Sequence, residues 1–168
     1  MKHKELARQA VIAAVYTAIS LALMPITFGV VQCRIAESMM VLPFYNRKHT
    51  VGLTLGCLIT NMFSPSLGMA DVVFGTAATF VACLCAVWLG AHVRRRRLNA
   101  ARFVWLVPAV AAAINGVIIG ALLYFVLGFP FIASAISVAA GEAVAVAAGV
   151  LAMRLIVSHQ RLNALVIE

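Results

Sequence analysis

Charged residues are scarce in this chain of 168 residues. Asp, Glu, Lys and Arg together make up 11% of it, whereas a soluble domain contains about 25%. The mean hydropathy is +1.06, and stretches without any charge run from 9 to 33, 49 to 70, 72 to 93 and 103 to 141. A helix that spans the lipid core needs about 20 mainly apolar residues. This composition predicts an all-α integral membrane protein.

Catalytic and nucleotide-binding motifs are missing as well. The chain has no G-x-x-x-x-G-K-[ST] phosphate loop, no G-x-S-x-G serine elbow and no H-E-x-x-H metal-binding helix. We therefore expect the chain to have no enzymatic activity, to hydrolyse no ATP itself because it has no ATPase motif, and to hold no resident cofactor or metal. Cysteines with metal-site spacing are also lacking, and Cys57, Cys83 and Cys85 lie in apolar runs, where we expect them to pack as small apolar side chains.

The apolar residues form six segments, all of which we expect to be helical within a single membrane domain. The second and third are shorter than a full span, so either could be re-entrant. Glycines one turn apart in "GLTLG" and "GVIIG" would allow close helix approach, either inside the bundle or toward another membrane protein. The expected helices are approximately 7–25, 35–46, 50–63, 70–92, 103–127 and 131–157.

The net charge of +8 is distributed in clusters between the apolar segments. Six spans with both termini in the cytoplasm would place every basic residue except Arg34 on the cytoplasmic side, as the positive-inside rule requires. The run "RRRR" at Arg94–Arg97 then reads as an anchor to anionic headgroups. We therefore expect no nucleic-acid partner.

Four charged residues lie apart from the basic clusters, inside or next to the apolar segments. They are Arg34, Glu37, Asp71 and Glu142. A charge at the centre of a spanning helix costs about 2.5–3.5 kcal/mol, so such residues are usually paired and functional. Each also has a structural explanation. Arg34 and Glu37, three residues apart, could form a local ion pair, and Asp71 could cap a helix. Glu142 could form an ion pair with Arg34 or be a protonated acid with a hydrogen bond. We expect these charges to converge with nearby carboxamides in one pocket that is anionic on balance. The candidate binding residues are Gln32, Arg34, Glu37, Asn61, Asp71, Asn115 and Glu142.

Several motifs of the sequence resemble a known transporter family. The segment "VQCRIAESMMVLP" resembles a segment of the QueT family of queuosine-precursor transporters. Two further segments resemble other parts of that family, "GLTLGCLITNMFSPSLGMADVVFGTAATFVA" and the closing "GEAVAVAAG". The resemblance covers nearly the whole chain in the same order. Members of this family are substrate-binding S components of energy-coupling factor (ECF) importers.

The resemblance implies a six-transmembrane-helix S-component bundle in a prokaryotic plasma membrane, with N- and C-termini in the cytoplasm. Its ligand would be a 7-deazaguanine such as preQ1, possibly preQ0 or queuine, bound near the external side. Its partners would be a membrane T component and two ATPase subunits, which use the ATP and drive transport by toppling of the S component. Small residues of the first helix would meet the T component, here Ala10, Ala14 and Ala18.

For the ligand that the resemblance implies, we expect one of Glu37 and Glu142 to bind the ring edge and the other to bind the ammonium group, in an order that stays open. Asp71 is the third candidate. Arg34 would orient a carboxylate or donate to the ring carbonyl. Two other functions remain alternatives from the residues alone. One is a stand-alone carrier coupled to cations or protons, which would also use buried acids, and the other is a membrane scaffold without a ligand.

Overall fold

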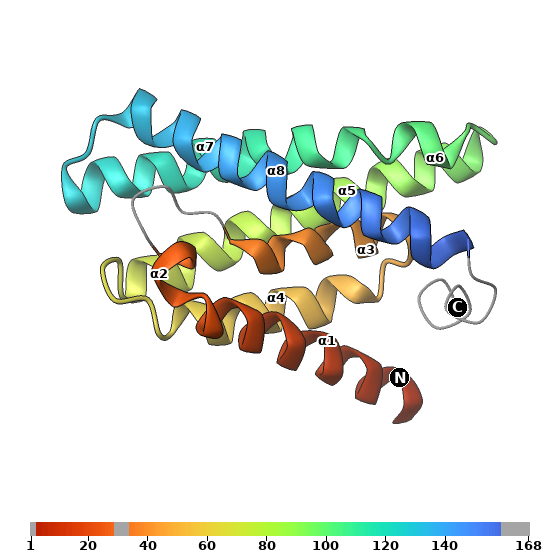
Figure 1. Cartoon of the computed structure of the whole chain (residues 1–168), viewed down its shortest axis with the longest axis horizontal. Helices are drawn as coiled ribbons and strands as arrows, with labels where there is room; N and C mark the ends of the chain where they lie inside the picture. Colours follow the sequence, from red (N-terminus) through yellow and green to blue (C-terminus); the bar gives the residue numbers. More distant parts are fainter. Residues whose placement is uncertain (1–2, 29–33, 159–168) are drawn as a thin grey trace.

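The computed structural model of the chain describes residues 3–28 and 34–158, which form helices joined by short turns (Figure 1). No strand occurs in these two ranges, and the all-helical prediction is confirmed. The expected segment 7–25 corresponds to α1 (His3–Ala22) and α2 (Met24–Thr27), and 50–63 corresponds to α4 (His49–Asn61). The last segment, 131–157, corresponds to α8 (Phe131–Ser158).

The other three segments contain irregular helices. The segment expected at 35–46 begins as a 3₁₀ helix, η1 (Ile35–Val41), and continues as α3 (Leu42–Tyr45). The segment at 70–92 begins as a π-helix, η2 (Asp71–Gly75), followed by α5 (Thr76–Arg95). The segment at 103–127 is divided into α6 (Ala100–Phe103) and α7 (Leu106–Leu127). The apolar runs of the sequence predict one helical segment in each of these three places, without indicating the change of helix type inside it.

Successive segments run back and forth along the bundle, so that connections alternate between its two ends (Figure 1). One end contains the start of α1, the α3–α4 and α5–α6 connections and the end of α8, and we call it the basic end. There Lys48 pairs with Glu5, and Arg94 donates a hydrogen bond to the main-chain oxygen of Phe44 over 2.8 Å. The basic clusters, scattered in sequence, therefore meet at one end.

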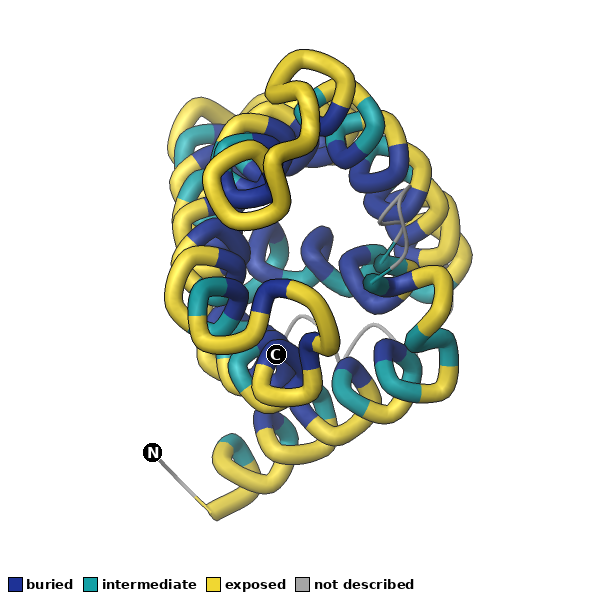
Figure 2. Tube along the Cα trace, turned by 90° about the vertical axis from the view of Figure 1, so that its left-hand side faces the viewer, coloured by how far each residue is buried: buried dark blue, intermediate teal, exposed yellow. Residues whose placement is uncertain are grey.

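Three helical stretches are long and apolar enough to cross a membrane: Asp71–Arg95, Ala100–Leu127 and Phe131–Val157. The stretch Ile35–Tyr45 is apolar but shorter. Looking along the bundle, Figure 2 shows buried residues facing the interior and exposed residues covering the outside. Large apolar side chains such as Phe125 and Leu155 are among the exposed ones, as expected for helices that face lipid. The chain is thus a membrane protein, and the count of six spans stays a prediction.

Glycines bring pairs of helices into close contact within the bundle. A side chain at Gly116 or Gly120 of α7 would collide with Ala135 of α8, because its Cβ would lie 2.9 and 2.8 Å from main-chain atoms of that residue. Gly56 of α4 meets Ala13 of α1 in the same way. Both glycine pairs noted in the sequence therefore serve internal packing.

The closest of these contacts holds the 3₁₀ helix in place. A Cβ at Gly149 of α8 would lie 1.8 Å from the main-chain oxygen of Ser38, which is next to Glu37. Only a glycine lets α8 pass the backbone of η1 at this separation. The contact sets the position of Glu37 along the bundle relative to α8.

We predict that Gly149→Ala destabilises the protein by about 1–3 kcal/mol or more, because the added methyl group must displace the backbone of η1. Unfolding in mixed detergent micelles measures this change. Val144→Ala, on the exposed face of the same helix, is the matched control and should change stability much less. Equal stability of the Gly149 variant and the wild type would contradict the packing described here.

Candidate functional site

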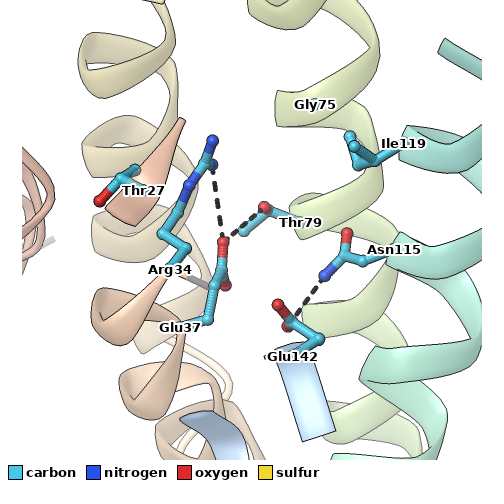
Figure 3. Close-up of a pocket in the computed structure, with 8 residues that line it drawn as sticks. All are labelled: Thr27, Arg34, Glu37, Gly75, Thr79, Asn115, Ile119 and Glu142. Carbon is cyan, nitrogen blue, oxygen red and sulfur yellow. Dashed lines mark hydrogen bonds and ion pairs between the residues drawn. The ribbon is translucent and has the colours of Figure 1, made fainter. Parts of the chain in front are cut away.

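A small cavity lies between the 3₁₀ helix η1 and helices α5, α7 and α8 (Figure 3). Its volume is about 30 Å³, enough for a few water molecules. Side chains with hydrogen-bonding groups make up most of its wall, in a bundle that is otherwise apolar. The lining residues are Thr27, Arg34, Glu37, Gly75, Thr79, Asn115, Ile119 and Glu142.

The carboxylate of Glu37 contacts three side chains from different parts of the chain. It is 3% exposed, and its Oε1 accepts hydrogen bonds from Tyr16 Oη at 2.5 Å and from Thr79 Oγ1 at 3.3 Å. Its other oxygen, Oε2, is buried without a partner among the described residues. A buried polar atom without a hydrogen bond costs about 1–3 kcal/mol. Glu37 therefore has one satisfied oxygen and one that is available to a ligand.

Arg34 lies between two carboxylates at the entrance to η1. Its Nη1 is 3.7 Å from Glu37 Oε1, and its Nη2 is 3.9 Å from Asp71 Oδ2. The guanidinium also lies over the ring of Phe28, 5.4 Å from its centroid, a favourable arrangement for a cation. The local ion pair suggested by the spacing of Arg34 and Glu37 is thus present, but Arg34 additionally connects η1 to η2.

Glu142 faces the cavity from α8, and its partner is an amide. Asn115 Nδ2 donates a hydrogen bond to Glu142 Oε1 over 2.9 Å, and both side chains are buried. No ion pair of Glu142 is present within the part of the chain described here. The structural pair between Arg34 and Glu142 considered from the sequence therefore does not form. Figure 3 shows Glu37 and Glu142 on opposite walls of the same space.

Asn61 and Asp71 lie beside the cavity without lining it. The Nδ2 of Asn61 donates to the main-chain oxygen of Asp71 at 3.1 Å and to Thr76 Oγ1 at 3.3 Å. These bonds fasten the π-helix, whose widened turn leaves main-chain groups without their usual partners. A Cβ at Gly75 would lie 2.3 Å from Asp71 Oδ1 and 2.9 Å from Asn61 Nδ2, so a larger residue there would displace these two side chains.

The structure thus brings four predicted binding residues together around the cavity and places two in the layer behind it. Arg34, Glu37, Asn115 and Glu142 line the cavity, whereas Asn61 and Asp71 support it. The seventh, Gln32, lies outside the described residues.

Sequence reasoning missed Tyr16 and Thr79, which contact Glu37 directly. A signal existed for Tyr16, which lies on the buried stripe of α1 with Gln9, Ala13 and Ser20. The interpretation of Cys57 as simple apolar packing was incomplete. Its thiol lies 3.4 Å from Arg34 Nη1 and 3.2 Å from Thr79 Oγ1, inside the same polar network.

The polar side chains around the cavity differ in the hydrogen-bonding groups that they offer. Across residues 3–28 and 34–158, no group of three or more His, Cys, Asp or Glu side chains is placed to hold a metal ion. The arrangement instead suits a small polar organic molecule, for which it provides one free carboxylate oxygen, a second carboxylate and a guanidinium.

Comparison with known proteins gives a family. Residues 6–158 match the sequence model of the family described as QueT transporter. The chain is also similar to the queuosine precursor transporter QueT of Lactococcus lactis subsp. cremoris (strain MG1363), with 32% identity over 74 residues. That alignment spans 43% of this chain and 43% of the relative's length. No solved structure matches the chain.

We predict that Asn61→Ala destabilises the protein by about 1–3 kcal/mol, because the main-chain oxygen of Asp71 loses its side-chain donor in a buried position. Thr60→Val is the matched control, since the Thr60 hydroxyl is buried without a partner among the described residues. Its removal should leave stability unchanged or slightly raise it. The measurement is unfolding in detergent, and equal effects of the two substitutions would contradict this role of Asn61.

Proposed function

The chain belongs to the QueT transporter family, and we propose that it is the substrate-binding S component of an ECF-type importer for a queuosine precursor. The proposed ligand is a 7-deazaguanine such as preQ1, possibly preQ0 or queuine. The similar Lactococcus protein is named for this class of substrate. The observation that carries the proposal is the polar cavity in which Glu37 Oε2 has no partner among the described residues and which a second buried carboxylate, that of Glu142, also lines.

The hydrogen-bonding groups of a 7-deazaguanine complement this cavity. Its ring N–H and exocyclic amine point in the same direction, and a carboxylate can accept from both. Its ring carbonyl needs a donor, which Arg34 or Asn115 could supply. In preQ1 an aminomethyl arm adds a positive charge, and the second carboxylate can compensate it. Each polar element of such a ligand thus has a counterpart on the wall.

The size of the cavity indicates how binding must proceed. Small-molecule pockets enclose about 300–1,000 Å³, whereas this cavity encloses about 30 Å³. A bicyclic base therefore enters only if the elements around the cavity move apart. The irregular helices η1 and η2 border the cavity, and stretches of these types often mark hinges or functional sites.

The charge distribution supports uptake from the external side. The basic end would face the cytoplasm, as the positive-inside rule requires, with the protein in the plasma membrane of a prokaryote. The connections at the opposite end would then be external. The cavity is lined by Thr27 of α2 and Arg34 at the start of η1, which flank one of these external connections. The ligand would therefore reach the site from outside.

Transport also needs an energy source and a partner surface. Because the chain lacks a nucleotide-binding loop, separate ATPase subunits would supply the energy through a T component. The chain itself would have no enzymatic activity and no bound cofactor. Ala10, Ala14 and Ala18 are all exposed on the face of α1 opposite Tyr16. This face of small residues would allow close approach of a helix of the T component, on which the protein would topple to deliver its ligand.

Calorimetric titration of the purified protein in detergent tests the binding function. We expect saturable binding at one site for at least one of preQ1, preQ0 and queuine, and much weaker binding of guanine, which lacks the substituent that Glu142 or its surroundings would contact. Binding of none of these bases by protein that is shown to be folded would contradict the proposed substrate class.

The docking surface is tested separately. Ala14→Trp should block association with the T component and ATP-dependent uptake into proteoliposomes, because a bulky side chain separates the two helices. Ligand binding in detergent should remain within about twofold of wild type, since Ala14 faces away from the cavity. Leu151→Trp, on an exposed part of α8, is the control for added bulk. Normal uptake by the Ala14 variant would exclude this face.

A further inference from the structure

One carboxylate of the cavity lacks a hydrogen-bond donor and the other lacks a cation. From this difference we propose that each carboxylate binds a different part of the ligand. Glu37 would accept hydrogen bonds from the uncharged ring edge, and Glu142 would bind the positively charged arm. Tyr16 and Thr79 would act as positioning residues for Glu37. This inference rests on the proposed function and assigns roles within the same site.

The surroundings of Glu37 supply its charge compensation but not all of its hydrogen bonds. Oε1 receives the hydroxyls of Tyr16 and Thr79, and the Arg34 guanidinium lies within 3.7 Å of it. These contacts hold the carboxylate in one orientation and leave Oε2 as a buried acceptor without a donor in the described part of the chain. A neutral N–H group satisfies this requirement, and an additional cation is not needed.

The surroundings of Glu142 are of the opposite kind. Asn115 satisfies Oε1 with a hydrogen bond, but an amide carries no charge. Arg34 is the one basic residue among the cavity-lining residues, and its ion pairs are with Glu37 and Asp71. A buried carboxylate without a cation is costly. Glu142 therefore needs either a proton or a positively charged partner, and a ligand ammonium would provide the latter.

The charge balance of the whole cluster agrees with this assignment. One guanidinium, that of Arg34, faces three acidic side chains, Glu37, Asp71 and Glu142. Two of the three lie within 4 Å of it, and the third, Glu142, projects from the opposite wall (Figure 3). A ligand lying between the walls with its amine toward α8 would leave both sides compensated.

The test compares two 7-deazaguanines that differ only in the arm, one with a cationic aminomethyl group and one with a neutral cyano group. For wild-type protein we expect the aminomethyl base to bind more tightly. Glu142→Gln should weaken binding of the aminomethyl base by about tenfold or more and weaken binding of the cyano base by a clearly smaller factor. Glu37→Gln should weaken both bases by similar factors, about tenfold or more.

The positioning role is tested by a double-mutant cycle. Tyr16→Phe should weaken both bases equally in the wild-type background and have little further effect in the Glu37→Gln background, because the hydroxyl acts through that carboxylate. Thr60→Val, which removes a buried hydroxyl away from the cavity lining, is the control. Additive effects of the Tyr16 and Glu37 substitutions would show that Tyr16 has a general structural role and would overturn its assignment.

The outcomes separate this inference from the function on which it rests. Folded wild-type protein that binds neither base would contradict the proposed function itself. Wild-type binding with equal losses of both bases in Glu142→Gln, or with a loss of the aminomethyl base alone in Glu37→Gln, would overturn the division of roles while leaving the function intact. Equal or tighter binding of the cyano base by the wild-type protein would also overturn the division of roles, and this comparison needs no variant that must fold.

Discussion

The burial of the Glu37 carboxylate in an apolar bundle is the constraint on which the site depends. An uncompensated charge in such an environment would be strongly unfavourable, so three parts of the chain converge on it. Tyr16 approaches from α1, Thr79 from α5 and Arg34 from the start of η1. The glycine contact between Gly149 and the backbone of Ser38 sets the position of η1. Packing and electrostatics thus act together here, because the packing of η1 against α8 places Glu37 and its neighbours satisfy one oxygen of its carboxylate.

Irregular helices accompany this polar cluster. The π-helix η2 begins at Asp71, where Asn61 holds a main-chain oxygen and Arg34 holds the carboxylate. The 3₁₀ helix η1 carries Glu37 on the opposite side. Departures from regular helix are often found at functional sites, because they direct side chains that a regular helix would place elsewhere. In this protein they border a cavity too small for the proposed ligand, so the same elements that hold the site closed would also have to let it open.

The sequence allowed much of this to be predicted, with limits that have physical causes. The low charge indicated a helical membrane protein, and isolated charges identified Arg34, Glu37 and Glu142, because a charge in an apolar run needs an explanation. Tyr16 and Thr79 escaped notice because neither carries a charge. The stripe of α1 that contains Tyr16 indicates a buried face but does not show which distant residue Tyr16 contacts. The roles of Asn61 and Asp71 depended on the π-helix, which periodicity does not reveal. The sequence also does not reveal that Glu142 pairs with Asn115 and not with Arg34, because this pairing depends on how α7 and α8 pack.

The most direct test of the account is an experimental structure with the 7-deazaguanine bound. The account predicts that the ring edge lies within hydrogen-bond distance of Glu37 Oε2, between the walls formed by η1 and α8, in a cavity larger than the present about 30 Å³. A base bound elsewhere, for instance in the apolar groove beside Phe74 and Phe125, with Glu37 Oε2 still without a partner, would contradict it.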